Sequence, residues 1–96
     1  MIVIINLDVE KSLICSKLGN VEIKTTYLVN NYYYDFVYGE FDFNLRHVLN
    51  VYGSSCNFWD LTIDTCDKSF CLSFNNLNEV LDFIIKVTFV LGMFYD

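Results

Sequence analysis

The chain has 96 residues and a formal net charge of −6, from 12 acidic and 6 basic side chains. A chain of this length buries about 60% of its unfolded surface, enough for one hydrophobic core, so residues 1–96 are expected to form a single domain. With 54% hydrophobic residues, the whole chain should fold. The negative charge repels phosphates and anionic headgroups, so we expect no direct binding to nucleic acid or membrane.

Three residue types are missing from the composition. Ala, Gln and Pro do not occur, whereas Asn, Ile, Phe and Tyr are abundant. This bias is typical of genes dominated by AT-rich codons, and it suggests an AT-rich bacterium or virus as the source. It also explains part of the aromatic content.

The cysteines favour a reducing compartment. The N-terminus has no basic segment before its apolar run and no small-residue cleavage site, so we expect no signal peptide. Free thiols in a cytoplasmic protein follow from this. A zinc site is not expected, because no Cys-x-x-Cys pair occurs and His47 is the only histidine. The cysteines are Cys15, Cys56, Cys66 and Cys71.

The first third of the chain predicts strands. Ile2 to Ile5 is a continuous apolar run, which favours a strand buried on both faces. Gly19-Asn20 fits a two-residue hairpin turn between two strand-forming runs. A helix over Val9 to Leu18 is the alternative. The hairpin would pair Leu18 with Val21 and Lys17 with Glu22.

The next segment is rich in aromatic residues. If Asn30-Asn31 forms a tight turn, Val29 faces Tyr32 and the following residues pair in register. Side chains alternate along a strand, so the even-numbered aromatics then point into the core. They are Tyr32, Tyr34, Phe36 and Tyr38.

The opposite side of this segment carries acidic residues, and no basic residue occurs between Lys24 and Arg46. It forms either a solvated face or a binding patch, and both interpretations stay open. The candidate partner-binding residues are Tyr33, Asp35, Glu40, Asp42, Asp60 and Asp64.

A helical period follows Gly39. Apolar residues at i, i+3, i+4 and i+7 predict a short amphipathic helix, capped by Asp42 or Asn44 and ended by Gly53. His47 lies off the apolar stripe, so we expect a surface histidine and not a ligand or catalytic base. The stripe is Leu45, Val48, Leu49 and Tyr52.

Clean alternation predicts a second hairpin beyond this helix. One strand places Trp59, Leu61 and Ile63 on one face, and Asp60, Thr62 and Asp64 on the other. Thr65 to Lys68 turns the chain. The next strand places Phe70, Leu72 and Phe74 together.

A long helix is predicted at the C-terminus, starting at Asn75 or Asn76, with Glu79 in a capping position. Asp82 and Lys86 form a favourable i, i+4 pair. Val87 to Tyr95 is apolar all round but shorter than the roughly 20 residues of a membrane span. It is either a buried helix end or a homodimer seam.

The residues VEIK, with Glu22 and Lys24, and the upstream Asp8 resemble the metal-binding core of the restriction-enzyme-like nucleases. The resemblance implies carboxylates that hold a divalent ion and a lysine that orients the attacking water. The chain lacks the Pro-Asp dipeptide of that family.

Other catalytic patterns are not found. Asp60 and Asp64 lie roughly 13 Å apart along an extended strand, so they do not converge with Asp67 on one ion. No Ser-His-Asp or Cys-His arrangement and no glycine-rich phosphate loop occurs. We expect no enzymatic activity, no metal and no cofactor.

The expected fold is therefore α+β: an antiparallel sheet of five to six strands, with a short middle helix and a longer C-terminal helix packed on one face.

The expected function is that of a small acidic binding protein. Spaced carboxylates can imitate nucleic-acid phosphates on a basic protein surface, and tyrosines add rigid contact area. With the AT-rich composition, this suggests a phage or mobile-element inhibitor of a defence protein such as a CRISPR effector. The alternatives are an immunity protein or antitoxin that caps a basic nuclease, and a self-assembling structural domain joined through Val87 to Tyr95.

Overall fold

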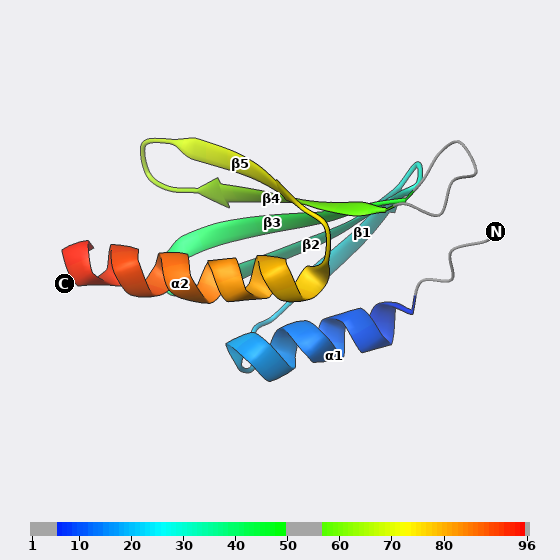
Figure 1. Ribbon diagram of the computed structural model, residues 1–96, viewed down its shortest axis with the longest axis horizontal. Helices are drawn as coiled ribbons and strands as arrows, with labels where there is room; N and C mark the ends of the chain where they lie inside the picture. Colours follow the sequence, from blue (N-terminus) through cyan, green and yellow to red (C-terminus); the bar gives the residue numbers. More distant parts are fainter. Residues whose placement is uncertain (1–5, 50–56, 96) are drawn as a thin grey trace.

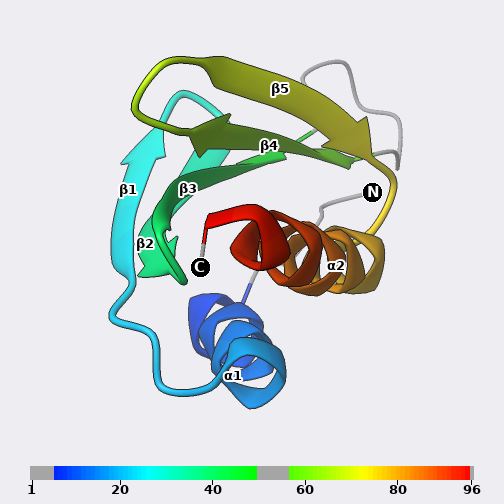
Figure 2. The ribbon, with the colours of Figure 1, turned by 90° about the vertical axis from the view of Figure 1, so that its left-hand side faces the viewer.

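Within the part of the chain that the structure describes, five antiparallel strands form one sheet in the order β1-β2-β3-β4-β5, so each strand pairs with the next along the chain. The computed structural model describes residues 6–49 and 57–95, with side chains as far as residue 90. Both helices cover the same face of the sheet, which curves around them (Figures 1 and 2). This confirms the α+β fold. The elements are α1 (Leu7–Leu18), β1 (Lys24–Leu28), β2 (Asn31–Tyr38), β3 (Phe41–Val48), β4 (Phe58–Asp64), β5 (Ser69–Phe74) and α2 (Leu77–Tyr95).

The short helix of the fold is N-terminal. Asn6 caps it, because the Asn6 Oδ1 accepts hydrogen bonds from the amides of Asp8 and Val9. Gly19 ends it with a φ of 93° and an amide that donates to the Cys15 carbonyl. The predicted hairpin at Gly19-Asn20 is therefore wrong, and the alternative helix is confirmed. The predicted strand over Ile2 to Ile5 lies outside the described residues.

The polar residue Glu10 interrupts the apolar face of α1, so the sequence of this helix does not show a regular amphipathic pattern. Ile14 and Leu18 are buried and Leu7 packs against the core, so the helix presents one face to the sheet. Glu10 lies on that same face, where its carboxylate accepts a hydrogen bond from the Tyr34 hydroxyl. An acid at a core-facing position breaks the apolar stripe on which helix prediction depends.

The β1–β2 turn lies one residue earlier than predicted. Val29 and Asn30 form it, with φ values of 41° and 60°, as the two central residues of a type I′ turn require. Tyr27 consequently pairs with Tyr32 and not with Tyr34. Shifting the turn by one residue moves each partner by two, so every side chain keeps its face. The even-numbered aromatics of β2 do point to the core, where Tyr34 and Phe36 are buried.

The first part of the predicted middle helix, including Leu45 and Val48, is the central strand β3. Tyr52 and Gly53, which belonged to the same prediction, lie outside the described residues. Gly39 and Glu40 make a tight turn after β2, with Gly39 at a φ of 67°, and β3 then pairs with β2 and β4. The buried positions alternate along the strand: they are Phe41, Phe43, Leu45 and His47. Because His47 is polar, the apolar alternation of this strand is interrupted in the sequence, and the helical spacing of its apolar residues is the more regular pattern.

The expectation of a surface histidine is also wrong. His47 is 3% exposed and its ring stacks on Trp59, with the ring centroids 3.9 Å apart. Its Nδ1 lies 3.0 Å from Glu10 Oε2. The histidine thus takes the place of an aromatic core residue in β3.

The second hairpin and the C-terminal helix start as predicted. Trp59, Leu61 and Ile63 are buried on one face of β4, and Thr65 closes the turn by donating its amide to the Lys68 carbonyl. Asn76 caps α2, because its Oδ1 accepts from the Glu79 amide at 2.9 Å.

Two further expectations concern α2. The Asp82 carboxylate, expected to pair with Lys86, lies 2.8 Å from the Lys17 ammonium and ties α2 to α1. Within Val87 to Tyr95, expected as a buried helix end or a dimer seam, Phe89 and Val90 are exposed, and the side chains of residues 91–95 lie outside the described residues.

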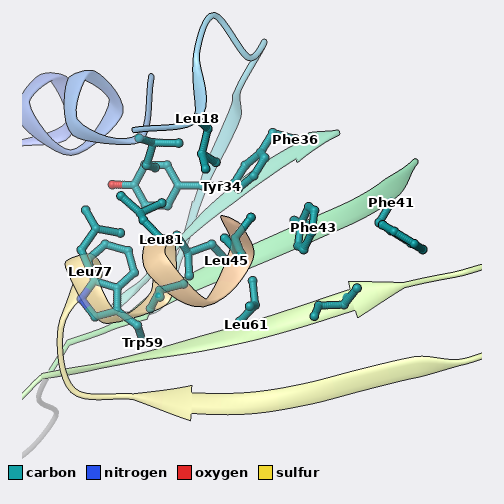
Figure 3. Packing of buried hydrophobic residues seen from close by; sticks show 14 residues of the cluster. Leu18, Tyr34, Phe36, Phe41, Phe43, Leu45, Trp59, Leu61, Leu77 and Leu81 are labelled. Carbon is teal, nitrogen blue, oxygen red and sulfur yellow. The ribbon is translucent and has the colours of Figure 1, made fainter. Parts of the chain in front are cut away.

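The core lies between the concave face of the sheet and the two helices (Figure 3). Burial of each large apolar side chain contributes about 1.5–3 kcal/mol, so this cluster fixes which side of the sheet faces inward. Its helical members are Ile14, Leu18, Leu77, Val80, Leu81 and Ile84, and its strand members are Tyr34, Phe36, Phe41, Phe43, Leu45, Trp59, Leu61 and Ile63.

Candidate protein-binding face

The convex side of the sheet, which we name the outer face, is turned away from both helices (Figure 2). Because side chains alternate along each strand, the residues between the buried ones point to this side. They are mostly polar or charged. They include Lys24, Tyr33, Asp35, Asp42, Asn44, Arg46, Asp60, Thr62, Asp64, Ser69 and Ser73.

Two acids face each other across the outer face. Asp42 of β3 is the direct partner of Asp64 of β4. The same row continues to Val37 and to Ser69, whose hydroxyl donates to Asp64. The row contains no base, and directly opposed like charges destabilise a sheet. Two exposed acids are therefore opposed on neighbouring strands with no base in their row.

The neighbouring row is electrically more balanced. Asp35 lies opposite Lys24 on β1 and opposite Asn44 on β3. The Asn44 side-chain amide donates to Asp35 Oδ1 at 2.6 Å. This carboxylate is exposed but held in place, so it adds a fixed negative charge beside the Asp42–Asp64 pair.

The third row neutralises its own acid. Arg46 forms an ion pair with Asp60, which also accepts a hydrogen bond from Ser73 Oγ at 2.7 Å. The Asp60 carboxylate and, after it, the Tyr33 hydroxyl raise the pKa of the Arg46 guanidinium above its ordinary value. Asp60 is only 8% exposed. It stabilises the sheet and offers little charge to a partner.

A hollow of about 580 Å³ lies over the first two rows. Its charged lining consists of four acids and one base, and the apolar part includes Phe36, Val37 and Phe43. The charged residues are Glu22, Lys24, Asp35, Asp42 and Asp64. We name this set the acidic hollow. It has the shape and sign to receive a cationic side chain from another protein.

The structure sorts the six residues predicted to bind a partner. Asp35, Asp42 and Asp64 meet in the acidic hollow, and Glu40 is exposed in the adjoining β2–β3 turn. Tyr33 and Asp60 belong to the Arg46 row, where Tyr33 is half-buried and Asp60 buried. Glu22 was missed as a binding candidate, although its two-residue spacing from Lys24 places it on the same side.

The nuclease-like constellation does not assemble. Asp8 lies in the first turn of α1, whereas Glu22 and Lys24 follow its other end, and the ten residues of rise from Asp8 to Leu18 span roughly 15 Å. Across residues 6–49 and 57–95, no group of three or more His, Cys, Asp or Glu side chains is arranged to hold a metal ion.

Comparison of the chain with protein-family models, characterised proteins and solved structures gives no match. In the described part of the chain, no helix is both long enough and apolar enough to cross a lipid bilayer.

Proposed function

We propose that this protein is a small, acidic, non-enzymatic inhibitor that covers a basic, nucleic-acid-binding surface of another protein with its outer face. The source and setting proposed are a phage or mobile element and the cytoplasm of its host, and the target is a defence protein such as a CRISPR effector. The AT-rich composition and the net charge of −6 support this setting.

The observation that carries the proposal is the opposition of Asp42 and Asp64. In the isolated protein this arrangement costs stability, because the two carboxylates repel each other across the strands. A lysine or arginine of a partner would relieve the repulsion and gain a charge-assisted hydrogen bond. The repulsion that destabilises the free protein would therefore be replaced by attraction in the complex, which favours binding.

The spacing of the acids also supports imitation of a nucleic acid. Neighbouring strands lie about 4.8 Å apart and alternate residues about 6.6 Å apart along a strand. Phosphates of one nucleic-acid strand follow each other at a comparable several-ångström spacing. Asp35, Asp42 and Asp64 occupy positions of this kind on three adjacent strands.

The test compares two baits of equal charge. In the first, Asp42→Asn and Asp64→Asn remove the opposed pair. In the second, Asp8→Asn and Glu79→Gln remove two exposed acids from the first turns of the helices, on the other side of the molecule. Both baits and the wild type are incubated with bacterial lysate, and bound proteins are identified by mass spectrometry.

The expected result is that wild type and the helix variant retain the same nucleic-acid-binding protein, whereas the outer-face variant loses it. High salt or added DNA should release the captured protein, because both compete for its basic surface. Equal capture by all three baits would remove the acidic hollow from the interface. Equal loss in both variants would indicate an effect of net charge alone.

A further inference from the structure

An apolar groove of about 330 Å³ lies on the helix side of the sheet, between β5 and the second half of α2. None of the residues that line it is charged. Phe70 and Leu72 point toward the core side, yet they remain 50% and 39% exposed, and Val90 across the groove is 49% exposed. The main apolar side chains are Ile63, Phe70 and Leu72 from the strands and Phe83, Val87 and Val90 from α2.

β5 is also an edge of the sheet formed by residues 6–49 and 57–95. It lies beyond β4 as seen from α2 (Figure 2), and within these residues it pairs only with β4. Natural edge strands are usually protected from further pairing by Lys, Pro or a bulge. The sequence of β5, SFCLSF, contains no charged residue and no proline, whereas the other edge strand, β1, carries Lys24.

We infer that β5 and the adjoining apolar groove form the interface of a two-fold symmetric homodimer. In this dimer the β5 strands of two copies pair antiparallel and join the two sheets into one. This interaction is separate from the acidic hollow and does not depend on it.

The pattern of β5 is self-complementary. A two-fold axis through Leu72 places Leu72 opposite its own copy and Phe70 opposite Phe74. Apolar side chains then meet apolar side chains on the groove side, and serine and cysteine meet on the outer face, as cross-strand pairing requires. A symmetric homodimer satisfies this condition with one surface used twice.

Charge also favours this edge for self-association. Each copy carries a net charge of −6, so two copies repel each other over most of their surfaces. The uncharged groove and strand are where this repulsion is weakest. The exposed apolar surface of each copy at this edge is on the order of 200 Å², contributed by Phe70, Leu72 and Val90. This is about a quarter of the ~800 Å² that each partner buries in a standard interface. Pairing of the six-residue strand and its flanks would supply the rest.

The experiment is sedimentation of the purified full chain from low to high micromolar concentration, at low and high salt. We expect the mass to rise from 11.3 kDa to twice that value. Added salt should strengthen the dimer, because it screens repulsion between two acidic copies. This is opposite to the salt effect expected for a basic partner on the outer face, so the two proposals fail independently.

Two variants with the same substitution locate the interface. Leu72→Lys on β5 should abolish the doubled mass, whereas Leu28→Lys, an exposed leucine on the β1 edge, should leave it unchanged. Circular dichroism is the folding control, and the spectra of both variants should match that of the wild type. A monomer at every concentration, or a dimer lost only in Leu28→Lys, would overturn the inference.

Hydrogen exchange of the wild type provides a test that needs no variant. Amides of residues 69–74 should become protected as protein concentration rises. Exchange in β5 that is independent of concentration would contradict the dimer. An apolar dye that fills the groove should compete with dimerisation and lower the sedimenting mass. Saturation of the groove by the dye with no change in sedimentation would also contradict the dimer.

Discussion

The phenol of Tyr34 donates a hydrogen bond to the carboxylate of Glu10, which joins the centre of β2 to α1. Tyr34 is fully buried, and its ring lies 6.0 Å from that of Trp59. Glu10 also approaches His47. A polar cluster thus replaces hydrocarbon contacts at the interface between the first helix and the sheet, and its partners position α1.

Replacement of Tyr34 by Phe should lower stability by about 1–3 kcal/mol at neutral pH, because Glu10 loses a hydrogen-bond donor in a largely buried position. Urea unfolding followed by Trp59 fluorescence measures this, since Trp59 is the only tryptophan. Tyr27→Phe at the exposed hairpin is the control and should change stability by less than about 0.5 kcal/mol. Equal stability of the Tyr34→Phe variant and wild type would show that the bond contributes nothing.

The burial of Tyr34 and its hydrogen bond to Glu10 should make the stability of the protein decrease at alkaline pH. Burial first, and then the Glu10 carboxylate, raise the pKa of the Tyr34 phenol well above its ordinary value. A raised folded-state pKa gives stability that is fully present below the unfolded value of about 10 and lost as the pH rises beyond it. The free energy of unfolding should fall above that pH in wild type and in Tyr27→Phe, and fall less steeply in Tyr34→Phe. Identical slopes in all three would exclude Tyr34 as the source.

Neutralising one member of the opposed acid pair should stabilise the fold. Asp42→Asn removes repulsion from Asp64 and is expected to raise the free energy of unfolding by roughly 0.2–1 kcal/mol at low salt, with a smaller gain at high salt. Asp35→Asn is the comparison, and it should lower stability because Asp35 lies opposite Lys24 and accepts from Asn44. A loss of stability in Asp42→Asn would show that this carboxylate is satisfied within the fold.

Partner binding should respond in the opposite direction. Asp42→Asn, which stabilises the isolated protein, is expected to weaken binding to the captured basic partner by about tenfold, or ~1.4 kcal/mol. Conversion of Asp35, Glu40 and Asp42 together to their amides should weaken it further. Titration calorimetry at two salt concentrations measures both. Unchanged affinity in the triple variant would move the interface away from this end of the outer face.

The start of α2 depends on its cap. Asn76→Ala removes the acceptor for the Glu79 amide and should cost about 1 kcal/mol. Asn78→Ala, an exposed position within the first turn of the helix, should be neutral or slightly stabilising because alanine has the higher helix propensity. Thermal melts of the two variants distinguish a capping effect from a general effect of losing an asparagine.

Alternation and capping patterns in the sequence were sufficient for β2, β4, β5 and α2. The inward side of β2 was predicted although its turn was misplaced by one residue, because a shift of one residue in the turn preserves the parity of cross-strand pairs. Asn76 was identified because a cap is a local interaction between residues close in sequence. Strand alternation likewise assigned Tyr33 and Asp35 to the polar side before any strand order was known, whereas Asp42 was expected as a possible helix cap.

Tertiary packing decided the rest. His47 was expected at the surface, but it is accommodated in the interior because Glu10, Tyr34 and Trp59 reach it or its partner from three other elements. The polar Glu10 interrupts the apolar face of α1, so the sequence favoured a hairpin there. The polar His47 interrupts the apolar alternation of β3, so the sequence favoured a helix. The opposition of Asp42 to Asp64 depends likewise on the pairing register of β3 and β4. Composition determined that this protein is acidic and apolar enough to fold, whereas strand pairing between distant residues determined which charges meet and which edge stays open.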